Sequence, residues 1–596
     1  MRYTFLLLPL FLTVLLFSQT APTSKSQALA TFQSNVRVVL LDVIVTDSNG
    51  TPVTGLTQND FRVFEDDKPQ NIASFKEHNG APITTVDLPP MPPNVYTNYT
   101  GVKTADSINV LLMDSLNTQM PDQQYVHQQT LKYLKTLPAG ARVAIFTLSS
   151  RLRMVQEFTS DSSRLLAALN DPALSGPRHS PLLKSQPESQ ADDATVGMAS
   201  ANQMSLNPNP INLAQEAADP VNALKALIAE KDAAMTEARV AITLSAFQQL
   251  ARYLSAYPGR KNVIWVSGSF PLVLFGDSAS SNPSVTPRMY MNDILRTADL
   301  CTAAQMAIYP VTAEGLMIHS VYQADASAIG EVRPSMMGQN NVSQMNAELQ
   351  NVSSTRQTAE SLAKNTGGQA FFNSNGITDI LTRVTNQGMH YYTLTYSPTN
   401  TKSDNRYRHT RVESTNPKYV LSYRRGYYAT DSKTGLGAAD AQDPLLPLMG
   451  FGLPDMAQLV YKLSVTPSSA KSSGSSGNAV SDLKGPTTHY TLDFAVSLNQ
   501  IKLDVQPDGS RHAQLEVKAV AYDDAGKPLN MAGQRGLLNI TPEGFQGAQE
   551  SGVHFEEELD LPSNTDIHLR TGVYDLNSGN AGTLGVRVHT QATGSN

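Results

Sequence analysis

The pattern of apolar and polar positions changes character twice along the chain. Between Val36 and Phe75, runs of β-branched and aromatic residues are separated by turn sequences such as Asp47-Ser48-Asn49-Gly50. Asn and Gly supply the positive φ angles that tight turns require. These features predict a small all-β module at residues 31–76. Residues 77–107 are rich in Pro, Thr and Asn, which predicts a linker.

From Ile108 onward, apolar runs of strand length alternate with segments of helical periodicity. Strands are predicted at Ile108–Met113, Arg142–Thr147, Met154–Phe158, Asn262–Val266, Ile308–Thr312, Gln369–Phe372 and His390–Tyr396. Helices are predicted at Asp122–Leu137, Ser162–Leu169, Thr236–Tyr257, Asp293–Ala307, Gln357–Asn365 and Ile377–Gln387. Strands separated by helices favour βαβ crossovers, so residues 108–398 are predicted to form a doubly wound α/β domain with a mostly parallel sheet.

Two segments interrupt this rhythm, and a second β region follows it. Residues 172–219 and 324–356 are rich in Ser, Asn, Gln and Pro or Met without a core pattern, which predicts insertions on a loop edge. We further predict a β-rich extension at 399–429 and a linker at 430–454. Strands Thr410–Ser414 and Tyr419–Tyr423 of the extension alternate like Tyr391–Tyr396, which predicts an antiparallel edge formed by the three. Alternating strands at residues 455–590 predict a C-terminal β-sandwich.

The N-terminus has the features of an export signal. Arg2 precedes the apolar run Phe5–Phe17, and small or polar residues follow it. This order predicts a signal peptide and leader at residues 1–30, and export to the periplasm or beyond the cell. The alternative is an uncleaved anchor. No later stretch is long and apolar enough to span a membrane, which needs about 20 residues.

Composition narrows the classes of function. The 596 residues carry a net charge of -7 without a block of Lys or Arg, which argues against a nucleic-acid surface. Cys301 is the single cysteine, so no disulfide can form within the chain. It lies in an apolar helical segment, which indicates a buried small side chain more than a catalytic thiol.

The candidate chemistry lies where the first strand of the α/β region ends. Asp114 follows the apolar run Ile108–Met113, and Ser115, Asn117 and Thr118 come next. In open parallel sheets, ligands bind at the carboxyl ends of the strands. Carboxylate and hydroxyl oxygens suit Mg²⁺ or Ca²⁺, so this loop is a candidate metal site. The alternative is that Asp114 only caps the loop or the next helix.

An aspartate at the end of a first strand, small polar residues and an amphipathic helix resemble the von Willebrand factor A domain, over about Ile108 to Pro398. Motifs outside that core are also similar to the von Willebrand factor A-related family of exported Acidobacterial proteins. They are Asp42-Val43, Asp47, Gly50, Pro52-Val53, Gly55-Leu56-Thr57, Asp60-Phe61, Phe64-Glu65-Asp66, the tract Pro258-Gly259-Arg260-Lys261-Asn262-Val263-Ile264-Trp265, and Gly426-Tyr427.

The resemblance implies a divalent-metal site made by Asp-x-Ser-x-Ser, a Thr from a second loop and an Asp from a third. Asp114 matches the first aspartate, Leu116 replaces the first serine, and Thr118 replaces the second. Thr243, or less favourably Thr236, matches the second-loop Thr.

The third loop departs further from the family pattern. Ser267-Gly268-Ser269 stands where the family has Thr-Asp-Gly, so that carboxylate is missing. Ser115, Asn117 and Ser267 are possible neighbouring ligands. We therefore expect weak binding of Mg²⁺ or Ca²⁺, with a carboxylate of a partner completing the shell.

No catalytic motif competes with this interpretation. The chain has no His-Glu-x-x-His, no phosphate-binding Gly-x-x-x-x-Gly-Lys and no dinucleotide-binding turn after the first strand. We predict no enzymatic activity, and an exported protein-binding or adhesion-type module that recognises a protein or an envelope ligand. The alternatives are a structural envelope protein with a non-functional metal site, and an enzyme or enzyme subunit with an unrecognised site.

Overall fold

The computed structural model describes residues 38–80, 84–85, 90–99, 102–104, 107–205, 218–270, 291–313, 356–372, 376–404, 406–429, 443–468, 483 and 485–591. The predicted signal peptide lies outside these residues, as do nearly all of the predicted insertion at 324–356 and residues 430–442. Within the described ranges, no helix has the length and apolar character needed to cross a membrane.

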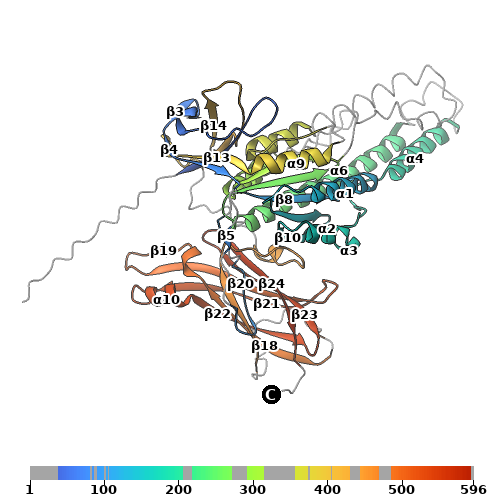
Figure 1. The fold of residues 1–596 in the computed structure, drawn as a ribbon. Coiled ribbons are helices and arrows are strands. Elements are labelled where there is room, and N and C mark those ends of the chain that lie inside the picture. The colour runs from blue at the N-terminus through green and yellow to red at the C-terminus, as the bar shows by residue number, and fades with distance from the viewer. Residues whose placement is uncertain are drawn as a thin grey trace, which may run out of the picture. The chain divides into compact units, whose positions relative to one another are not determined.

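A five-stranded sheet forms the centre of the α/β domain (Figure 1). Its order is β10 (Leu152–Thr159), β9 (Val143–Leu148), β8 (Ser107–Asp114), β11 (Arg260–Ser267) and β12 (Met306–Thr312). All neighbours are parallel except β10, which runs antiparallel to β9. Phe371 adds a parallel bridge to Val311 beyond β12. The strands spread outward from β8 in both directions, as in doubly wound folds.

Helices cover both faces of this sheet. On one face α1 (Met120–Lys135), α2 (Ser162–Asn170) and α9 (Ile377–Gly388) pack against alternate strand residues such as Leu111. On the other face α6 (Ala218–Leu254), α7 (Met291–Ala303) and the helical residues 356–366 pack against the intervening residues, such as Leu112. Burial on both faces explains why the strands are near-continuous apolar runs.

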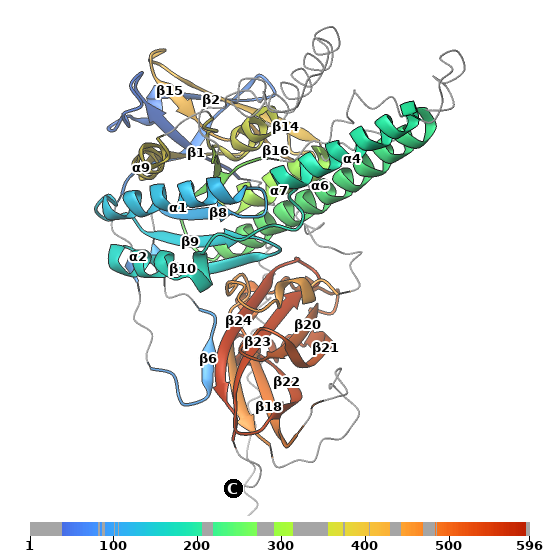
Figure 2. The ribbon, with the colours of Figure 1, turned by 90° about the vertical axis from the view of Figure 1, so that its right-hand side faces the viewer.

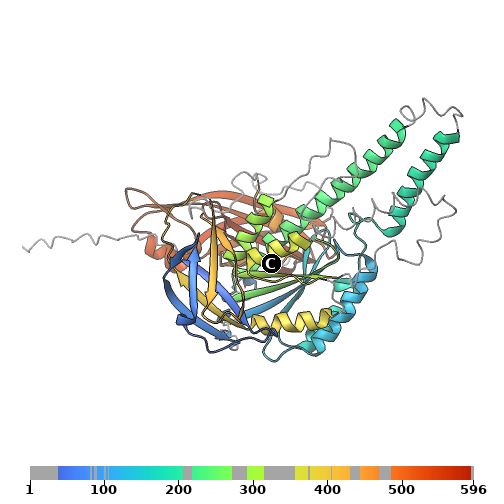
Figure 3. The same cartoon turned by 90° about the horizontal axis from the view of Figure 1, so that it is seen from above.

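The segment 172–219, predicted as an insertion on a loop edge without a core pattern, contains helices. They are α3 (Pro172–Ser175) and α4 (Gln186–Ser205), and α6 begins at Ala218 instead of Thr236. Helices α4 and α6 lie side by side as a hairpin, the arm, which extends away from the sheet in Figures 2 and 3. The apolar residues of the arm are spread around its helices, so no amphipathic stripe marks it in the sequence.

The N-terminal β module is built from two distant parts of the chain. One sheet has the order β15 (Val420–Ser422), β1 (Val39–Thr46), β13 (His390–Tyr396) and β4 (Ile72–Asn79). The other has the order β16 (Gly426–Tyr428), β14 (Tyr407–Ser414), β2 (Phe61–Glu65) and β3 (Lys68–Gln70), with a short helix η1 (Gln58–Asp60) before β2.

Three predictions are corrected by this pairing. The segments 31–76 and 399–429 were predicted as separate pieces, and His390–Tyr396 as the last strand of the α/β domain, at an antiparallel edge with Thr410–Ser414 and Tyr419–Tyr423. In the structure β13 pairs antiparallel with β1, Val43 opposite Tyr392, and with β4. Local periodicity shows that a segment is a strand, but it does not show which distant strand it pairs with.

The C-terminal module has two sheets with a shared core. One contains β22 (Val553–Pro562), β18 (Thr487–Val496), β17 (Tyr461–Pro467) and β6 (Val95–Thr97), and the other contains β19 (Asp504–Val505), β20 (Arg511–Tyr522), β21 (Pro528–Ile540), β23 (Asp566–Asp575) and β24 (Ala581–His589). Two shorter helices, η5 (Leu498–Gln500) and α10 (Phe545–Ser551), also belong to this module.

Both predicted linkers contain residues that belong to packed structure. Strand β6 comes from residues 77–107 and pairs with β17, and Asn98 Nδ2 donates to the carbonyls of Met456 and Leu459 at 2.6 and 2.8 Å. The same segment holds the small ladder of β5 (Thr84–Thr85) and β7 (Val102–Thr104). In residues 430–454, η4 (Leu446–Leu448) belongs to an apolar cluster with Val520.

Candidate functional site

Two strands bring the candidate residues to one edge of the central sheet. β8 and β11 are adjacent and parallel, with Met113 opposite Val266, so Asp114 and Ser267 lie at neighbouring carboxyl ends. After Asp114 the chain makes a short loop and enters α1 at Met120. We call this region, formed by residues 114–119 and 267–269, the Asp114 edge.

Four hydrogen bonds hold the carboxylate of Asp114. Its Oδ2 accepts from Trp265 Nε1 at 2.9 Å, Ser267 Oγ at 2.8 Å and Asn117 Nδ2 at 2.9 Å. Its Oδ1 accepts from the backbone N–H of Asn117 at 3.0 Å. The side chain is only 3% exposed. Burial raises the pKa of Asp114, and the donors from Asn117, Ser267 and Trp265 oppose that rise.

A second layer of contacts connects Asn117 to the half-buried guanidinium of Arg239. Asn117 Nδ2 also donates to Thr243 Oγ1 at 3.1 Å, and Asn117 Oδ1 accepts from Arg239 Nη1 at 3.2 Å. Arg239 Nη2 donates to Thr236 Oγ1 at 3.2 Å. Burial lowers the pKa of Arg239, and the negative charge of Asp114 opposes that effect. Arg239 thus supplies positive charge close to the carboxylate without contacting it directly.

The residues at this edge do not fit a divalent cation. The groups that face Asp114 are N–H and O–H donors, and the nearby charge is a guanidinium, whereas a metal requires several converging oxygen lone pairs. Thr118 Oγ1 accepts from the backbone N–H of Gly268 at 2.8 Å. In the described part of the chain, no three His, Cys, Asp or Glu side chains are grouped to hold a metal. A ligating role for Asp114 therefore gains no support from this geometry.

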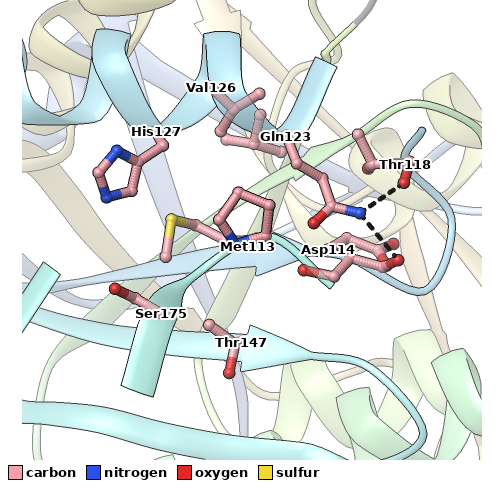
Figure 4. Close-up of a pocket in the computed structure, with 11 residues that line it drawn as sticks. Met113, Asp114, Thr118, Gln123, Val126, His127, Thr147 and Ser175 are labelled. Carbon is pink, nitrogen blue, oxygen red and sulfur yellow. Dashed lines mark hydrogen bonds between the residues drawn. The ribbon is translucent and has the colours of Figure 1, made fainter. Parts of the chain in front are cut away.

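A small cavity lies beside the loop (Figure 4). Asp114, Ser115, Thr118 and Gln123 line it together with His127 from the next turn of α1. Its volume of about 20 Å³ is room for one water molecule and not for an organic substrate. Gln123 Nε2 donates to the carbonyl of Thr118 at 2.7 Å and closes one wall.

The arm is anchored at the same edge. Gln119 Nε2 donates to the carbonyl of Lys184 at 2.8 Å, just before α4. The ammonium of Lys184 then bridges the two helices of the arm, at 2.7 Å from Asp192 on α4 and 2.9 Å from Asp232 on α6. Gln123 also exchanges two hydrogen bonds with the backbone of Arg178, at 2.8 and 2.9 Å. The base of the arm is therefore fixed to the loop that follows Asp114.

The sequence predicted most of the residues at the Asp114 edge but not the guanidinium of Arg239. Asp114, Asn117, Thr243 and Ser267 share one network, while Thr118 joins it through Gly268, and Ser115 lines the cavity. Trp265 and Arg239 were missed, although the sequence carries a signal for both. Trp265 precedes Ser267 by two residues and shares its face of the strand, and Arg239 precedes Thr243 by four residues and shares its face of the helix.

Comparisons with known proteins add only remote likenesses. No family model matches the chain, and no curated protein does. Among solved structures, von Willebrand factor type A from Catenulispora acidiphila is 9% identical, with 89% of this chain and 76% of that chain covered, at a TM-score of 0.22.

Two further structures cover about half of this chain. The conserved hypothetical protein BatB from Bacteroides thetaiotaomicron is 9% identical, with 48% of this chain and 98% of that chain covered, at a TM-score of 0.21. The PilB minor pilin from Streptococcus sanguinis is 8% identical, with 48% of this chain and 60% of that chain covered, at a TM-score of 0.22. The description of the fold therefore rests on the strand order and register of this chain.

Proposed function

We propose that this chain is an exported binding protein, and that its α/β domain recognises a partner protein through the Asp114 edge and the arm. The observation that carries the proposal is the anchoring of the arm by Gln119 and Lys184. It joins a long helical hairpin to the edge where open α/β sheets bind their ligands.

Two large apolar side chains of the arm are exposed to solvent. Met198 on α4 is 68% exposed and Leu227 on α6 is 64% exposed, whereas the later residues of α6, such as Phe247, are buried against the sheet. Exposed large apolar side chains on both helices of the arm suit a surface that becomes covered by a partner. The first half of α6 and helix α4 are therefore the contact surface that we propose.

Binding suits the Asp114 edge better than catalysis does. The acceptors of Asp114 are used by four donors, and the adjoining cavity holds no more than a water molecule. A general acid or base must reach a substrate proton within hydrogen-bond distance, which this enclosed carboxylate does not. We propose that the network keeps the edge rigid, which lowers the entropy lost on association.

A photo-crosslinking amino acid at Met198 or Leu227 tests the contact surface, with the same group at Leu537 as the matched control. Leu537 lies on β21 and is 79% exposed. Incubation with the exported fraction should give one and the same adduct from both arm positions and none from Leu537. Chelation of divalent ions should leave the adduct unchanged, because the cation at the edge is Arg239. No adduct from the arm, or an equal adduct from Leu537, contradicts the proposal.

N-terminal sequencing of the mature protein tests the proposed export. Cleavage within residues 18–30 is expected from the position of the apolar run Phe5–Phe17. Recovery of an intact Met1 on a cytoplasmic protein contradicts it.

A further inference from the structure

A groove lies far along the chain from the Asp114 edge, between the central domain and the N-terminal β module. One wall is formed by residues 360–370, with Glu360 and Lys364 on the helical turn above it. The other wall is formed by Leu421 of β15 and by Tyr423 and Arg425. Its volume is about 330 Å³, well above the 20 Å³ of the cavity at Asp114.

Two glycines beside the groove permit close backbone contacts. Gly367 has φ +83°, and a Cβ there would lie 2.9 Å from the backbone nitrogen of Arg424. A Cβ on Gly368 would lie 2.0 Å from the carbonyl oxygen of Ile308. The backbone N–H of Arg425 donates to the carbonyl of Lys364 at 3.2 Å. Gly367 thus brings the two walls into backbone contact at one end, and Gly368 brings the first wall against β12.

One wall of the groove carries an open strand edge. β15 is the outermost strand of its sheet and pairs only with β1, Leu421 opposite Val45. On its other side, no strand of the described residues pairs with it. Open edges present backbone N–H and C=O groups that an extended peptide can pair with.

The groove is also lined by Arg425, whose guanidinium can bind a carboxylate. The guanidinium of Arg425 lies 4.6 Å from the ring centroid of Tyr423 and donates to its hydroxyl at 2.7 Å. Arg425 is exposed and has no carboxylate partner within the described residues. Lys364 pairs with Glu360 at 2.9 Å, so these three charged groups sum to one positive charge. A stacked, oriented guanidinium binds a carboxylate well because little of its freedom remains to be lost.

We propose that this groove binds an extended peptide of a partner protein, which adds as a strand to β15 and places an Asp or Glu side chain on Arg425. This site does not depend on the binding surface proposed for the Asp114 edge. Backbone pairing supplies part of the affinity, and Arg425 selects the acidic side chain.

Fluorescence anisotropy with three labelled peptides on the full chain tests this proposal. The first alternates Val and Glu over a strand length, the second has Gln for every Glu, and the third keeps Glu but is N-methylated on alternate residues so that it cannot pair as a strand. The acidic peptide should bind with a Kd at or below about 1 mM. The other two peptides should bind roughly tenfold or more weakly, because they lose charge-assisted or backbone hydrogen bonds.

The variants Arg425→Glu and Arg587→Glu complete the test. Both arginines are exposed, and Arg587 lies on β24 of the C-terminal module. Arg425→Glu should weaken binding of the acidic peptide roughly tenfold or more, with an unchanged circular dichroism spectrum. Arg587→Glu should leave the affinity for this peptide unchanged. The peptide should also slow hydrogen exchange at residues 420–422.

Several outcomes overturn the proposal. They are no binding of the acidic peptide, equal binding by Arg425→Glu, and equal binding of the N-methylated peptide. The last would show capture of charge without strand addition.

Discussion

The two ends of strand β11 bury charge in opposite ways. At the carboxyl end, Trp265 and Ser267 donate to a carboxylate that accepts four hydrogen bonds in all. At the amino end, Arg260 donates to the hydroxyl of Tyr309 at 3.0 Å and the carbonyl of Gly367 at 2.7 Å. Its neighbour Lys261 makes no side-chain hydrogen bond to any residue that the structure describes. All eight residues of the strand are buried.

This contrast separates a buried charge held by several hydrogen bonds from a buried charge that makes no side-chain hydrogen bond within the described residues. Lys261 is 2% exposed, and burial lowers its pKa to about 7, with the charge of Asp42 only partly opposing that effect. A paired buried charge becomes costly when its partners are removed, whereas an unpaired one is costly as it stands. Substitution of Asp114 should therefore lower the stability of the protein, and substitution of Lys261 should raise it.

Asp114→Asn should have the largest effect. The new amide keeps the size of the side chain but points N–H groups at donors from Trp265, Ser267 or Asn117, and it leaves Arg239 without its nearby negative charge. We expect a loss of about 3 kcal/mol in the free energy of unfolding of the α/β domain. Trp265 is the single Trp, so urea unfolding followed by its fluorescence reports on this domain.

Glu543→Gln is the matched control for that substitution, because Glu543 is exposed in the C-terminal module. It should change stability by less than about 0.5 kcal/mol. An Asp114→Asn variant as stable as this control would show that the network does not hold the carboxylate as described.

Lys261→Met should have the opposite sign. The apolar side chain avoids burying an ammonium, so we expect a gain of roughly 2 kcal/mol at pH 7. The folded pKa of about 7 lies below the ordinary value of 10.5, so the unfolded chain binds more protons between these two values. Wild-type stability should therefore rise with pH across this window, and the advantage of the variant should shrink.

Urea unfolding at several pH values between about 7 and 10 checks this prediction. Lys462→Met is the control, because Lys462 is exposed on β17 and should show no such pH dependence. A constant difference between wild type and Lys261→Met would contradict the assignment of the pH dependence to this lysine.

Trp265→Phe should have a smaller effect than Asp114→Asn. The substitution removes one of the four hydrogen bonds to Asp114, and the bonds from Ser267 and Asn117 remain. A phenyl ring can keep the contacts with Phe247 and Phe270, whose centroids lie 4.9 and 4.7 Å from the indole. We expect a loss of about 1 kcal/mol, measured by far-ultraviolet circular dichroism because the fluorophore is gone. A loss as large as that of Asp114→Asn would contradict a carboxylate shared among several donors.

The sequence predicted these two ends of β11 unequally. The end of an apolar strand at Asp114 is a local feature, whereas Thr243 and Ser267 were predicted from the resemblance to the von Willebrand factor A domain. The amino end lies near Asp42 of β1, whose strand pairs with β13 from the far end of the α/β region. No local pattern carries such pairing, which is why the pairing of β13 with β1 and β4 was not predicted.

Arg239 at the carboxyl edge shows a second limit of prediction from sequence. The expected metal site was based on oxygen-bearing residues and on the family pattern, so a guanidinium 122 residues after Asn117 was not considered. Arg239 could be found only by asking which residues share a helical face with Thr243. The arm was missed for a related reason, since its helices lack the apolar stripe that makes a helix visible in sequence.

Divalent metal should have the smallest effect of all. Millimolar Mg²⁺, Ca²⁺ or Mn²⁺ should leave the melting temperature of the wild type unchanged, because a ligand stabilises only in proportion to its occupancy of the folded state. To bind at Asp114, the ion would have to displace the amide of Asn117 and stay close to the guanidinium of Arg239, which repels it. Asp114→Asn measured at the same metal concentrations is the control. A rise in melting temperature with metal in the wild type that disappears in this variant would restore the metal site and contradict the fixed cation. A rise of equal size in both proteins would place metal binding elsewhere on the chain.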